Sequence, residues 1–357
     1  MSALRAAAVE AAPRRLAVLG TGVVGSAFVA RYARLRAAGV ALPALSWLAN
    51  SRHCSRVDRA DAAGEALAAA CASGARGDGA LHWLAHDDLG AGDVVVDATA
   101  SDAVAARHGL WLRRGVDVVT ANKLGQGAAL ARADEIRAAQ AVAGARYGDG
   151  ATVGAGLPLL SSLRALVAGG DRIHAVEGIL SGSLAWLFNG YDGSRPFSER
   201  LRLAREQGYT EPDPRVDLSG EDVRRKLLIL ARAAGWALEA DAVSVASLLP
   251  RALAQAAVAR DGDWRELDAP LADRLAEARA AGGSLQVVGR LDHDGASVAL
   301  RVLPAGHALA GGRGTDNRVA IWSDRYSAQP LVIQGPGAGA EVTAAALLDD
   351  VLALHRA

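Results

Sequence analysis

The feature that most constrains the fold is a glycine-rich turn near the start of the chain, in the sequence GTGVVG. An apolar segment, RRLAVL, precedes this turn, and an amphipathic helical segment, SAFVARYARL, follows it. Gly20, Gly22 and Gly25 match the pattern G-x-G-x-x-G. In that pattern the first glycine allows a tight turn, the second lets a pyrophosphate approach, and the third lets the helix pack on the strand. The helix N-terminus, at Val23 and Val24, presents free N–H groups to phosphate, so the sequence predicts a Rossmann-type dinucleotide-binding unit.

Further apolar segments alternate with helical ones along the first part of the chain. ALSWLANSR is a candidate strand that ends near residue 52. DVVVDATAS and DVVTANK are two more, separated by the helical segment DAVAARHGLWLRRG. Strands that alternate with helices imply crossover connections and a parallel sheet. We therefore expect an α/β fold whose dinucleotide-binding domain spans residues 14–150.

The middle of the chain has a different pattern. Two stretches, RIHAVEGILSGSLAWLFNG and SLQVVGRLDHDGASVALRVLPAG, look like sheet strands, and long helical segments lie between them. This order predicts an α+β domain over residues 151–330, which we expect to bind the substrate. Residues 331–357 again have the pattern of strand, glycine loop and helix, and we expect this segment to return and complete the first domain.

Composition excludes several functional classes. The 357 residues carry 39 basic and 39 acidic side chains, so there is no electrostatic footprint for nucleic acid or for an anionic membrane. No apolar stretch is long enough to span a bilayer, and the first residues lack the apolar core of a secretory signal. Two cysteines, Cys54 and Cys71, cannot build a disulfide framework, which fits a reducing cytoplasm.

The second candidate strand bears on which nicotinamide dinucleotide is preferred. An acidic residue at its end would accept a hydrogen bond from a ribose 2′-hydroxyl, whereas an arginine suits a 2′-phosphate. The strand ends in ANSR, with no carboxylate and with Arg52 at its tip. The sequence therefore favours NADP over NAD. The alternative is that Arg52 is an ordinary solvated side chain, because arginine is abundant in this chain.

Only two of the 39 basic residues are lysines, Lys123 and Lys226. Lys226 lies four residues after Asp222 on a predicted helix, next to an apolar stripe that includes Val223 and Leu227. A desolvated lysine can exchange its proton near neutral pH and an arginine cannot, so this pair predicts general acid–base catalysis. The alternative is a partly buried structural salt bridge. Lys123 ends a strand segment, where ligands of open parallel sheets collect; its alternative is a loop lysine that faces water.

An acidic stretch punctuated by proline and glycine, GYTEPDPRVDLSGED, precedes Lys226. Its carboxylates form either an exposed turn or a cradle for a substrate ammonium group, and spacing alone does not decide between these. They are Glu211, Asp213, Asp217, Glu221 and Asp222. The helix also places Glu221 four residues before Arg225, and we expect these two to form an exposed ion pair.

Together these motifs make the chain similar to the homoserine dehydrogenase family. The shared segments occur in the family's order from about residue 16 onward: GTGVVG, ANSR, TANK, GATVGAGLPLLSSL, GILSGSLAWLFN, GYTEPDPRVDLSGEDVRRKLLILAR and GPGAGAEVTAAALLDDVL. The resemblance implies NAD(P)-dependent, reversible reduction of L-aspartate 4-semialdehyde to L-homoserine, a step toward threonine and methionine. It also implies a homodimer, and a monofunctional enzyme with neither a kinase domain nor a regulatory ACT domain.

The resemblance assigns roles to particular residues. Lys226 is implied to give and take the proton, with help from Asp222. Glu211 and Asp222 are implied to bind the substrate, with Asp217 as a helper. Lys123 is implied to contact substrate or cofactor, and which lysine dominates proton transfer stays open. The positions implied to surround the cofactor are Thr99, Asn122, Gly208, Gly339 and Thr343.

The segment GATVGAGLP is similar to a loop that, in the family, binds a monovalent cation mainly through backbone carbonyls. The resemblance implies a site for an ion such as Na⁺ at Gly150, Val153, Ala155 and Leu157. The family usually has glutamate at position 150, so glycine removes any side-chain contribution there.

Two rival functions are weighed against this one. A phosphorylating semialdehyde dehydrogenase needs a nucleophilic cysteine near the nicotinamide, and neither cysteine of this chain ends a catalytic strand. A catalytically silent sensor that binds NADP would keep the glycine turn but would need no paired lysine and acidic cradle.

Overall fold

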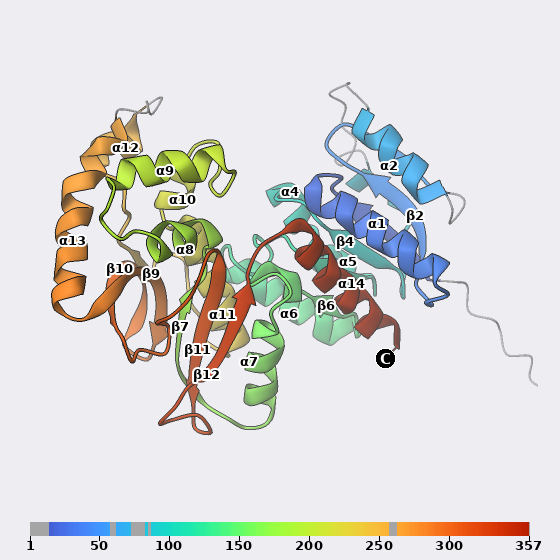
Figure 1. Ribbon diagram of the computed structural model, residues 1–357. Helices are drawn as coiled ribbons and strands as arrows, with labels where there is room; N and C mark the ends of the chain where they lie inside the picture. Colours follow the sequence, from blue (N-terminus) through green and yellow to red (C-terminus); the bar gives the residue numbers. More distant parts are fainter. Residues whose placement is uncertain (1–13, 58–61, 73–82, 85–86, 257–262, 357) are drawn as a thin grey trace, which may run out of the picture.

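The computed structural model describes residues 14–57, 62–72, 83–84, 87–256 and 263–356. Two lobes, each built around a six-stranded sheet, lie side by side (Figure 1). Within the ranges given, no helix combines the length and the apolar character needed to cross a membrane. The fold is α/β, with a Rossmann-type domain and a second domain, as the sequence predicted.

The first domain has helices on both faces of a mainly parallel sheet. Its elements are β1 (Arg15–Leu19), α1 (Val23–Ala37), β2 (Ala44–Ala49), β3 (Cys54–Arg56), α2 (Ala63–Ala72), β4 (Val94–Asp97), α4 (Asp102–Ala105), α5 (His108–Arg113), β5 (Asp117–Thr120), α6 (Leu130–Ala143) and β6 (Tyr147–Gly148). The strand order is β3-β2-β1-β4-β5-β6, parallel except at β3. Strands β4 and β5 are buried along their whole length, as is typical of a parallel sheet covered on both faces.

The second strand ends earlier than predicted. Strand β2 stops at Ala49, and the chain turns back to form β3, which pairs antiparallel with β2 at the edge of the sheet. The Asn50 side chain accepts hydrogen bonds from the backbone N–H groups of Arg52 and His53, at 2.8 Å each, and this stabilises the turn. Arg52 therefore lies in an exposed turn rather than at a strand end.

The second domain packs helices against one face of a largely antiparallel sheet. Its elements are η2 (Gly150–Thr152), α7 (Leu159–Ala168), β7 (Ile173–Ile179), α8 (Gly182–Asn189), α9 (Phe197–Glu206), α10 (Arg215–Leu218), α11 (Glu221–Ala233), β8 (Val243–Val245), α12 (Arg251–Gln255), η3 (Asp263–Leu267), α13 (Asp268–Ala280), β9 (Gly283–Asp292), β10 (Gly295–Pro304), β11 (Asp316–Ser323) and β12 (Leu331–Pro336). The strand order is β12-β11-β7-β9-β10-β8.

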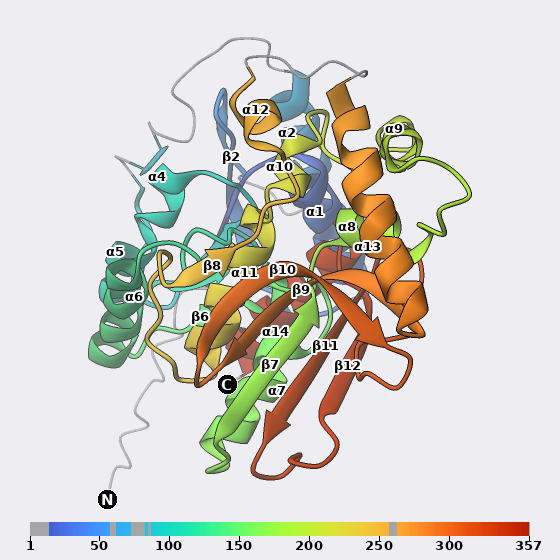
Figure 2. The same cartoon turned by 90° about the vertical axis from the view of Figure 1, so that its left-hand side faces the viewer.

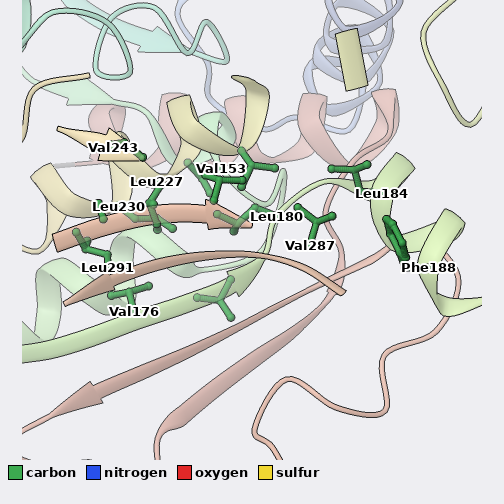
Figure 3. Packing of buried hydrophobic residues seen from close by; sticks show 14 of the residues in the cluster. Val153, Val176, Leu180, Leu184, Phe188, Leu227, Leu230, Val243, Val287 and Leu291 are labelled. Atoms are coloured by element: carbon green, nitrogen blue, oxygen red, sulfur yellow. The ribbon is translucent and has the colours of Figure 1, made fainter. Parts of the chain in front are cut away.

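Helix α11 is central to the core of this domain. Its apolar face, with Leu227 and Leu230, lies over β9 near Leu291, in the same buried cluster as Val287 further along that strand (Figure 3). The opposite face of the sheet lies toward the viewer in Figure 2. The core side of α11 is thus fixed, and its other side is free to carry polar groups.

The C-terminal segment divides between the two domains. We expected all of residues 331–357 to complete the first domain, but strand β12 pairs antiparallel with β11 and extends the second sheet. A short connection between neighbouring apolar strands favours this hairpin pairing. Only helix α14 (Ala340–Arg356) returns to the first domain, where it packs beside α1 (Figure 1).

Candidate functional site

The glycine turn fits a dinucleotide pyrophosphate. Gly20 has a φ of +99°, and a Cβ there would lie 2.8 Å from the carbonyl oxygen of Ala98. A Cβ on Gly25 would overlap the carbonyl oxygen of Gly20. Among the described residues, a Cβ on Gly22 would meet no atom within 4 Å, so the described part of the fold does not require glycine at this position. The open space at Gly22, at the start of α1, is the space that a phosphate approaching the helix N-terminus needs.

The Arg52 turn is tied to the glycine turn. The Asn50 side-chain nitrogen donates a hydrogen bond to Thr21 Oγ1 at 2.7 Å, while its oxygen holds the backbone of Arg52. The two segments that flank a bound dinucleotide in this fold are therefore connected, and Arg52 is exposed beside them.

One carboxylate joins the two lysines of the chain. Asp222 Oδ2 lies 2.7 Å from Lys226 Nζ, and Asp222 Oδ1 lies 3.4 Å from Lys123 Nζ. Asp222 and Lys226 come from successive turns of α11, whereas Lys123 follows β5 in the first domain. The lysines that the sequence singled out thus meet at the boundary of the two domains.

Lys226 is held by a second contact that comes from the backbone. Its ammonium group donates to the carbonyl oxygen of Leu180 at 2.7 Å, and the residue is only 8% exposed. The Leu180 side chain is fully buried next to Leu227 (Figure 3), which fixes the position of this carbonyl. Lys226 is therefore held firmly in a desolvated position.

The acidic groups of the site differ in their protonation behaviour. Burial raises the pKa of Asp222, but the nearby ammonium groups of Lys226 and Lys123 outweigh burial and lower the pKa to about 2. Burial raises the pKa of Asp217, and the negative charges of Glu211 and Asp222 act in the same direction. Asp222 is thus a permanent negative charge at neutral pH, while Asp217 holds its proton more readily than an ordinary aspartate.

A cleft of about 1160 Å³ opens over these groups. Predicted site residues that line it are Lys123, Gly208, Glu211, Asp217, Asp222, Lys226 and Gly339. The backbone N–H of Glu211 donates to Asp217 Oδ2 at 2.9 Å, so the acidic loop is folded onto α10. The volume is large enough for a small polar substrate together with one end of a dinucleotide.

Two residues predicted to surround the cofactor, Asn122 and Thr99, use their side chains to hold Asp97. Asn122 is 2% exposed, and its amide nitrogen donates to Asp97 Oδ2 and to the carbonyl oxygen of Ser101, both at 2.9 Å. Thr99 Oγ1 donates to Asp97 Oδ1 at 2.7 Å. Both residues shape the ends of β4 and β5 through Asp97. Thr343 Oγ1 donates to the carbonyl oxygen of Gly339 at 2.8 Å, within the first turn of α14.

The predicted cation loop lies between β6 and α7. Val153 and Ala155 are buried, and Ala155 has a positive φ of 50°, which is unusual for a residue other than glycine. The backbone N–H of Gly150 donates to Asp350 Oδ2 at 3.0 Å. Burial raises the pKa of Asp350 to about 6, and the charge of Asp149 adds to this effect. The carboxyl group of Asp350 in α14 thus lies beside position 150, where this chain has glycine and therefore no side-chain carboxyl group.

The sequence prediction of an ion pair between Glu221 and Arg225 was wrong. Glu221 pairs with Arg224 at 2.5 Å, three residues along α11, and Arg225 lines the cleft. Side chains three residues apart and four residues apart both lie close together on a helix. Helical periodicity alone therefore does not decide whether Glu221 pairs with Arg224 or with Arg225.

Two family models match the chain and together show its family. Residues 158–352 match the family model described as homoserine dehydrogenase, and residues 20–148 match the one described as homoserine dehydrogenase, NAD binding domain. The chain belongs to the homoserine dehydrogenase family. It is 42% identical over 278 residues to bifunctional aspartokinase/homoserine dehydrogenase 2, chloroplastic, of Zea mays, covering 77% of this chain and 30% of that protein. The chain thus spans less than a third of the length of this relative.

Shorter relatives and solved structures agree with this family. A homoserine dehydrogenase of Emericella nidulans is 39% identical over 273 residues, covering 72% of this chain and 74% of that protein. A Candida auris protein of unknown function has a solved structure with a TM-score of 0.83 and 32% identity, covering 96% and 98% of the two chains. A hyperthermophilic archaeal homoserine dehydrogenase in complex with NADPH has a TM-score of 0.72 and 19% identity, covering 96% and 98%, and shares the fold.

Sequence reasoning missed two groups of this homoserine dehydrogenase family site. The Leu180 carbonyl has no sequence signal, because every residue has a carbonyl. Asp97 did have one: it is a carboxylate at the end of the apolar run DVVVD, and it is fully buried among hydrogen-bond donors that include His108. A charged residue that ends a buried strand is a signal that could have found it.

Proposed function

We propose that the protein catalyses the reversible, NADP(H)-dependent interconversion of L-homoserine and L-aspartate 4-semialdehyde. The observation that supports this most directly is the Asp222 carboxylate shared by Lys123 and Lys226 at the cleft. A nicotinamide cofactor, when bound, supplies the hydride transfer. The residues of the chain then have to bind the substrate, align it and move one proton.

Lys226 is the proposed proton donor to the carbonyl oxygen of the semialdehyde. An ammonium group has three N–H donors. In the described part of the chain, Lys226 has acceptors in Asp222 and in the Leu180 carbonyl, which leaves one donor for a substrate oxygen in the cleft. In the reverse direction, neutral Lys226 takes the proton from the homoserine hydroxyl while Asp222 stabilises the ammonium that forms. Lys123 holds the other oxygen of Asp222 and is proposed to contact substrate or cofactor.

The acidic loop is the proposed site of the substrate ammonium group. Glu211 and Asp217 line the cleft close together, because Glu211 N–H donates to Asp217. Carboxylates bind an ammonium group through charge-assisted hydrogen bonds. A bound ammonium would also relieve the repulsion from Glu211 and Asp222 that contributes to the raised pKa of Asp217.

NADP rather than NAD is the proposed cofactor. The support is the exposed Arg52 next to the glycine turn, held there by Asn50. Arg52→Glu should lower kcat/KM for NADP at least tenfold and leave kcat/KM for NAD nearly unchanged, measured with both cofactors on one preparation. An unchanged ratio of the two values would remove Arg52 from this role. Gly208 and Gly339, which line the cleft, are proposed to lie beside the nicotinamide end.

The activity is tested by absorbance at 340 nm with homoserine and NADP. Wild-type protein should reduce NADP, and Lys226→Arg should lower kcat at least 100-fold, because a guanidinium keeps its proton. Near-normal turnover of Lys226→Arg with saturating substrates would refute the proton-transfer role. No homoserine-dependent reduction by wild-type protein at any pH tested would favour a silent NADP sensor. Cys54 and Cys71 do not line the cleft, which weighs against a phosphorylating dehydrogenase.

Other features of the enzyme are proposals of the same kind. We propose that residues 14–150 with α14 form the cofactor domain and that residues 151–336 form the substrate domain. A homodimer is proposed through the sheet face opposite α11, where the buried cluster around Ile179 of β7 and Val288 of β9 is much smaller than the core on the α11 face (Figure 2). A cytoplasmic location and a monovalent cation at residues 150–157 complete the proposal. Light scattering of the purified protein tests the dimer, and activity with and without Na⁺ tests the cation.

A further inference from the structure

The contact between Lys123 and Asp222 crosses from one domain to the other. Lys123 lies in the loop of residues 121–129, between β5 and α6, and Asp222 lies in the first turn of α11. Lysine side chains are long and flexible. The 3.4 Å separation between Lys123 Nζ and Asp222 Oδ1 therefore does not by itself fix the position of one domain against the other. Something else must fix the loop against the helix.

Arg232, in the last turn of α11, makes that connection. Its guanidinium donates to the carbonyl oxygens of Gln126, of Ala128 at 2.8 Å and of Leu238 at 3.1 Å. Two of these acceptors belong to the loop that carries Lys123. Arg232 is only 7% exposed, and burial lowers the pKa of its guanidinium, although Glu239 opposes this effect. A buried guanidinium is costly unless its donors are used, and here both terminal nitrogens hold backbone carbonyls, while the buried Nε has no hydrogen-bond partner among the described residues.

The loop also lies directly against α11. A Cβ on Gly127 would come within 2.7 Å of the Lys123 carbonyl oxygen and 2.9 Å of the Arg225 carbonyl oxygen, so only glycine fits between loop and helix. The Gly127 N–H donates to the Lys123 carbonyl at 2.6 Å, which links the anchored part of the loop to Lys123 itself. Glu239 adds a further link, because its carboxylate accepts the N–H of Leu130 at 3.0 Å.

We propose that Arg232 is a positioning residue that holds the loop of residues 121–129 on α11 and so keeps Lys123 against Asp222. The proposal rests on the proposed function, since it assigns Arg232 a part in the same reaction. Without the guanidinium, two loop carbonyls lose their donor, and Lys123 is no longer held at a set distance from the carboxylate. A misplaced catalytic group lowers the rate of the chemical step more than it weakens substrate binding.

A pocket beside Arg232 makes a chemical test possible. It has a volume of about 300 Å³ and is lined by residues that include Gln126, Arg137 and Arg232. Truncation of Arg232 would enlarge this pocket next to the loop carbonyls, so added guanidinium ion could occupy the vacated site. Arg137 provides a matched control, because it lines the same pocket but pairs with Asp134 of its own helix at 3.0 Å.

The experiment compares Arg232→Ala, Arg232→Lys and Arg137→Ala with wild-type enzyme. We expect kcat of Arg232→Ala to fall at least tenfold with KM for homoserine changed less than threefold, and millimolar guanidinium chloride to restore part of the rate. Arg232→Lys, which keeps the charge but offers a shorter reach, should lose less activity. Arg137→Ala should behave as wild type. An unchanged kcat in both Arg232 variants would overturn the proposal, and so would a tenfold loss in Arg137→Ala.

A double substitution separates positioning from general damage to the fold. If Arg232 acts through Lys123, Arg232→Ala should cost little further activity in a Lys123→Met background, and an equal loss in both backgrounds would overturn the proposal. Hydrogen exchange of residues 124–130 supplies a readout that does not need catalysis: Arg232→Ala should speed exchange there, and unchanged exchange would contradict the role. If wild-type enzyme lacks the activity, the proposed function fails while this exchange result still decides whether Arg232 holds the loop.

Discussion

Replacing Asp222 with asparagine removes the charge that both lysines contact while keeping the size of the side chain. Burial raises the pKa of Asp222, but attraction to Lys226 and Lys123 outweighs it and lowers the pKa from 3.8 to about 2. A fall of this size corresponds to about 2.5 kcal/mol, because each pKa unit is worth about 1.4 kcal/mol. The side chain is 39% exposed, so water screens the interaction, and we expect a loss of about 1–1.5 kcal/mol in the free energy of unfolding.

The pH dependence of this loss has a definite sign. A carboxylate whose pKa is lower in the folded state stabilises the fold above its unfolded pKa, near 4, and the effect is lost as pH falls through the folded pKa, near 2. The stability difference between wild type and Asp222→Asn should therefore be constant between pH 7 and about pH 5. It should be about half as large near pH 3, and it should vanish below about pH 2.

Urea unfolding followed by tryptophan fluorescence at pH 7, 5 and 3 measures this difference. Asp102→Asn is the control: Asp102 pairs with Arg132 at 2.7 Å, but it is 68% exposed, so no measurable loss of stability is expected. Homoserine-dependent NADP reduction by Asp222→Asn should fall at least 100-fold. The reasoning is refuted if Asp222→Asn is as stable as wild type at pH 7, or if the difference is the same at pH 3 as at pH 7.

The remaining predictions concern the glycine turn and the C-terminal helix. Gly22→Ala should leave the melting temperature unchanged, because its Cβ would meet no atom of the described residues within 4 Å, yet weaken NADP binding at least tenfold in a fluorescence titration. Gly25→Ala should lower both the melting temperature and the affinity for NADP, because its Cβ would overlap the Gly20 carbonyl. A normal melting temperature of this variant would count against the packing argument. Asp350→Asn should raise stability at pH 8 by about 1–3 kcal/mol and leave it unchanged at pH 4. The reason is that burial raises the pKa of Asp350 to about 6. Below about pH 4 the side chain is protonated and does not destabilise the fold, whereas its buried charge destabilises the fold once pH has risen through 6. Equal changes in stability at pH 4 and pH 8 would contradict this reasoning.

Contacts that depend on local periodicity were predictable from the sequence. Gly20 and Gly25 are required by the turn itself, and the spacing of a strand, three glycines and a helix is enough to show it. The pairing of Asp222 with Lys226 follows from one helical turn. The rarity of lysine identified Lys123 as well, although no local rule gives its distance from Asp222, because that distance depends on how the two domains pack.

The rest of the site depends on backbone groups and on long-range packing. The Leu180 carbonyl, which holds Lys226, and the loop carbonyls held by Arg232 belong to the main chain and leave no mark in the sequence. Strand β12 was assigned to the wrong sheet because a strand, a glycine loop and a helix look alike in either domain. The amide of Asn122 satisfies the buried Asp97, a demand that only the tertiary structure creates, and the predicted place of Asn122 beside the cofactor stays a prediction.

The return of α14 to the first domain has a consequence for biosynthesis. Leu347, Leu348 and Val351 are fully buried against the sheet and α1, so this half of the cofactor domain has no finished core without them. A ribosome makes the glycine turn early and these leucines more than three hundred residues later. Because nascent domains fold as units while they emerge, we expect the nucleotide-binding half to complete its core only after residues 340–356 have left the exit tunnel.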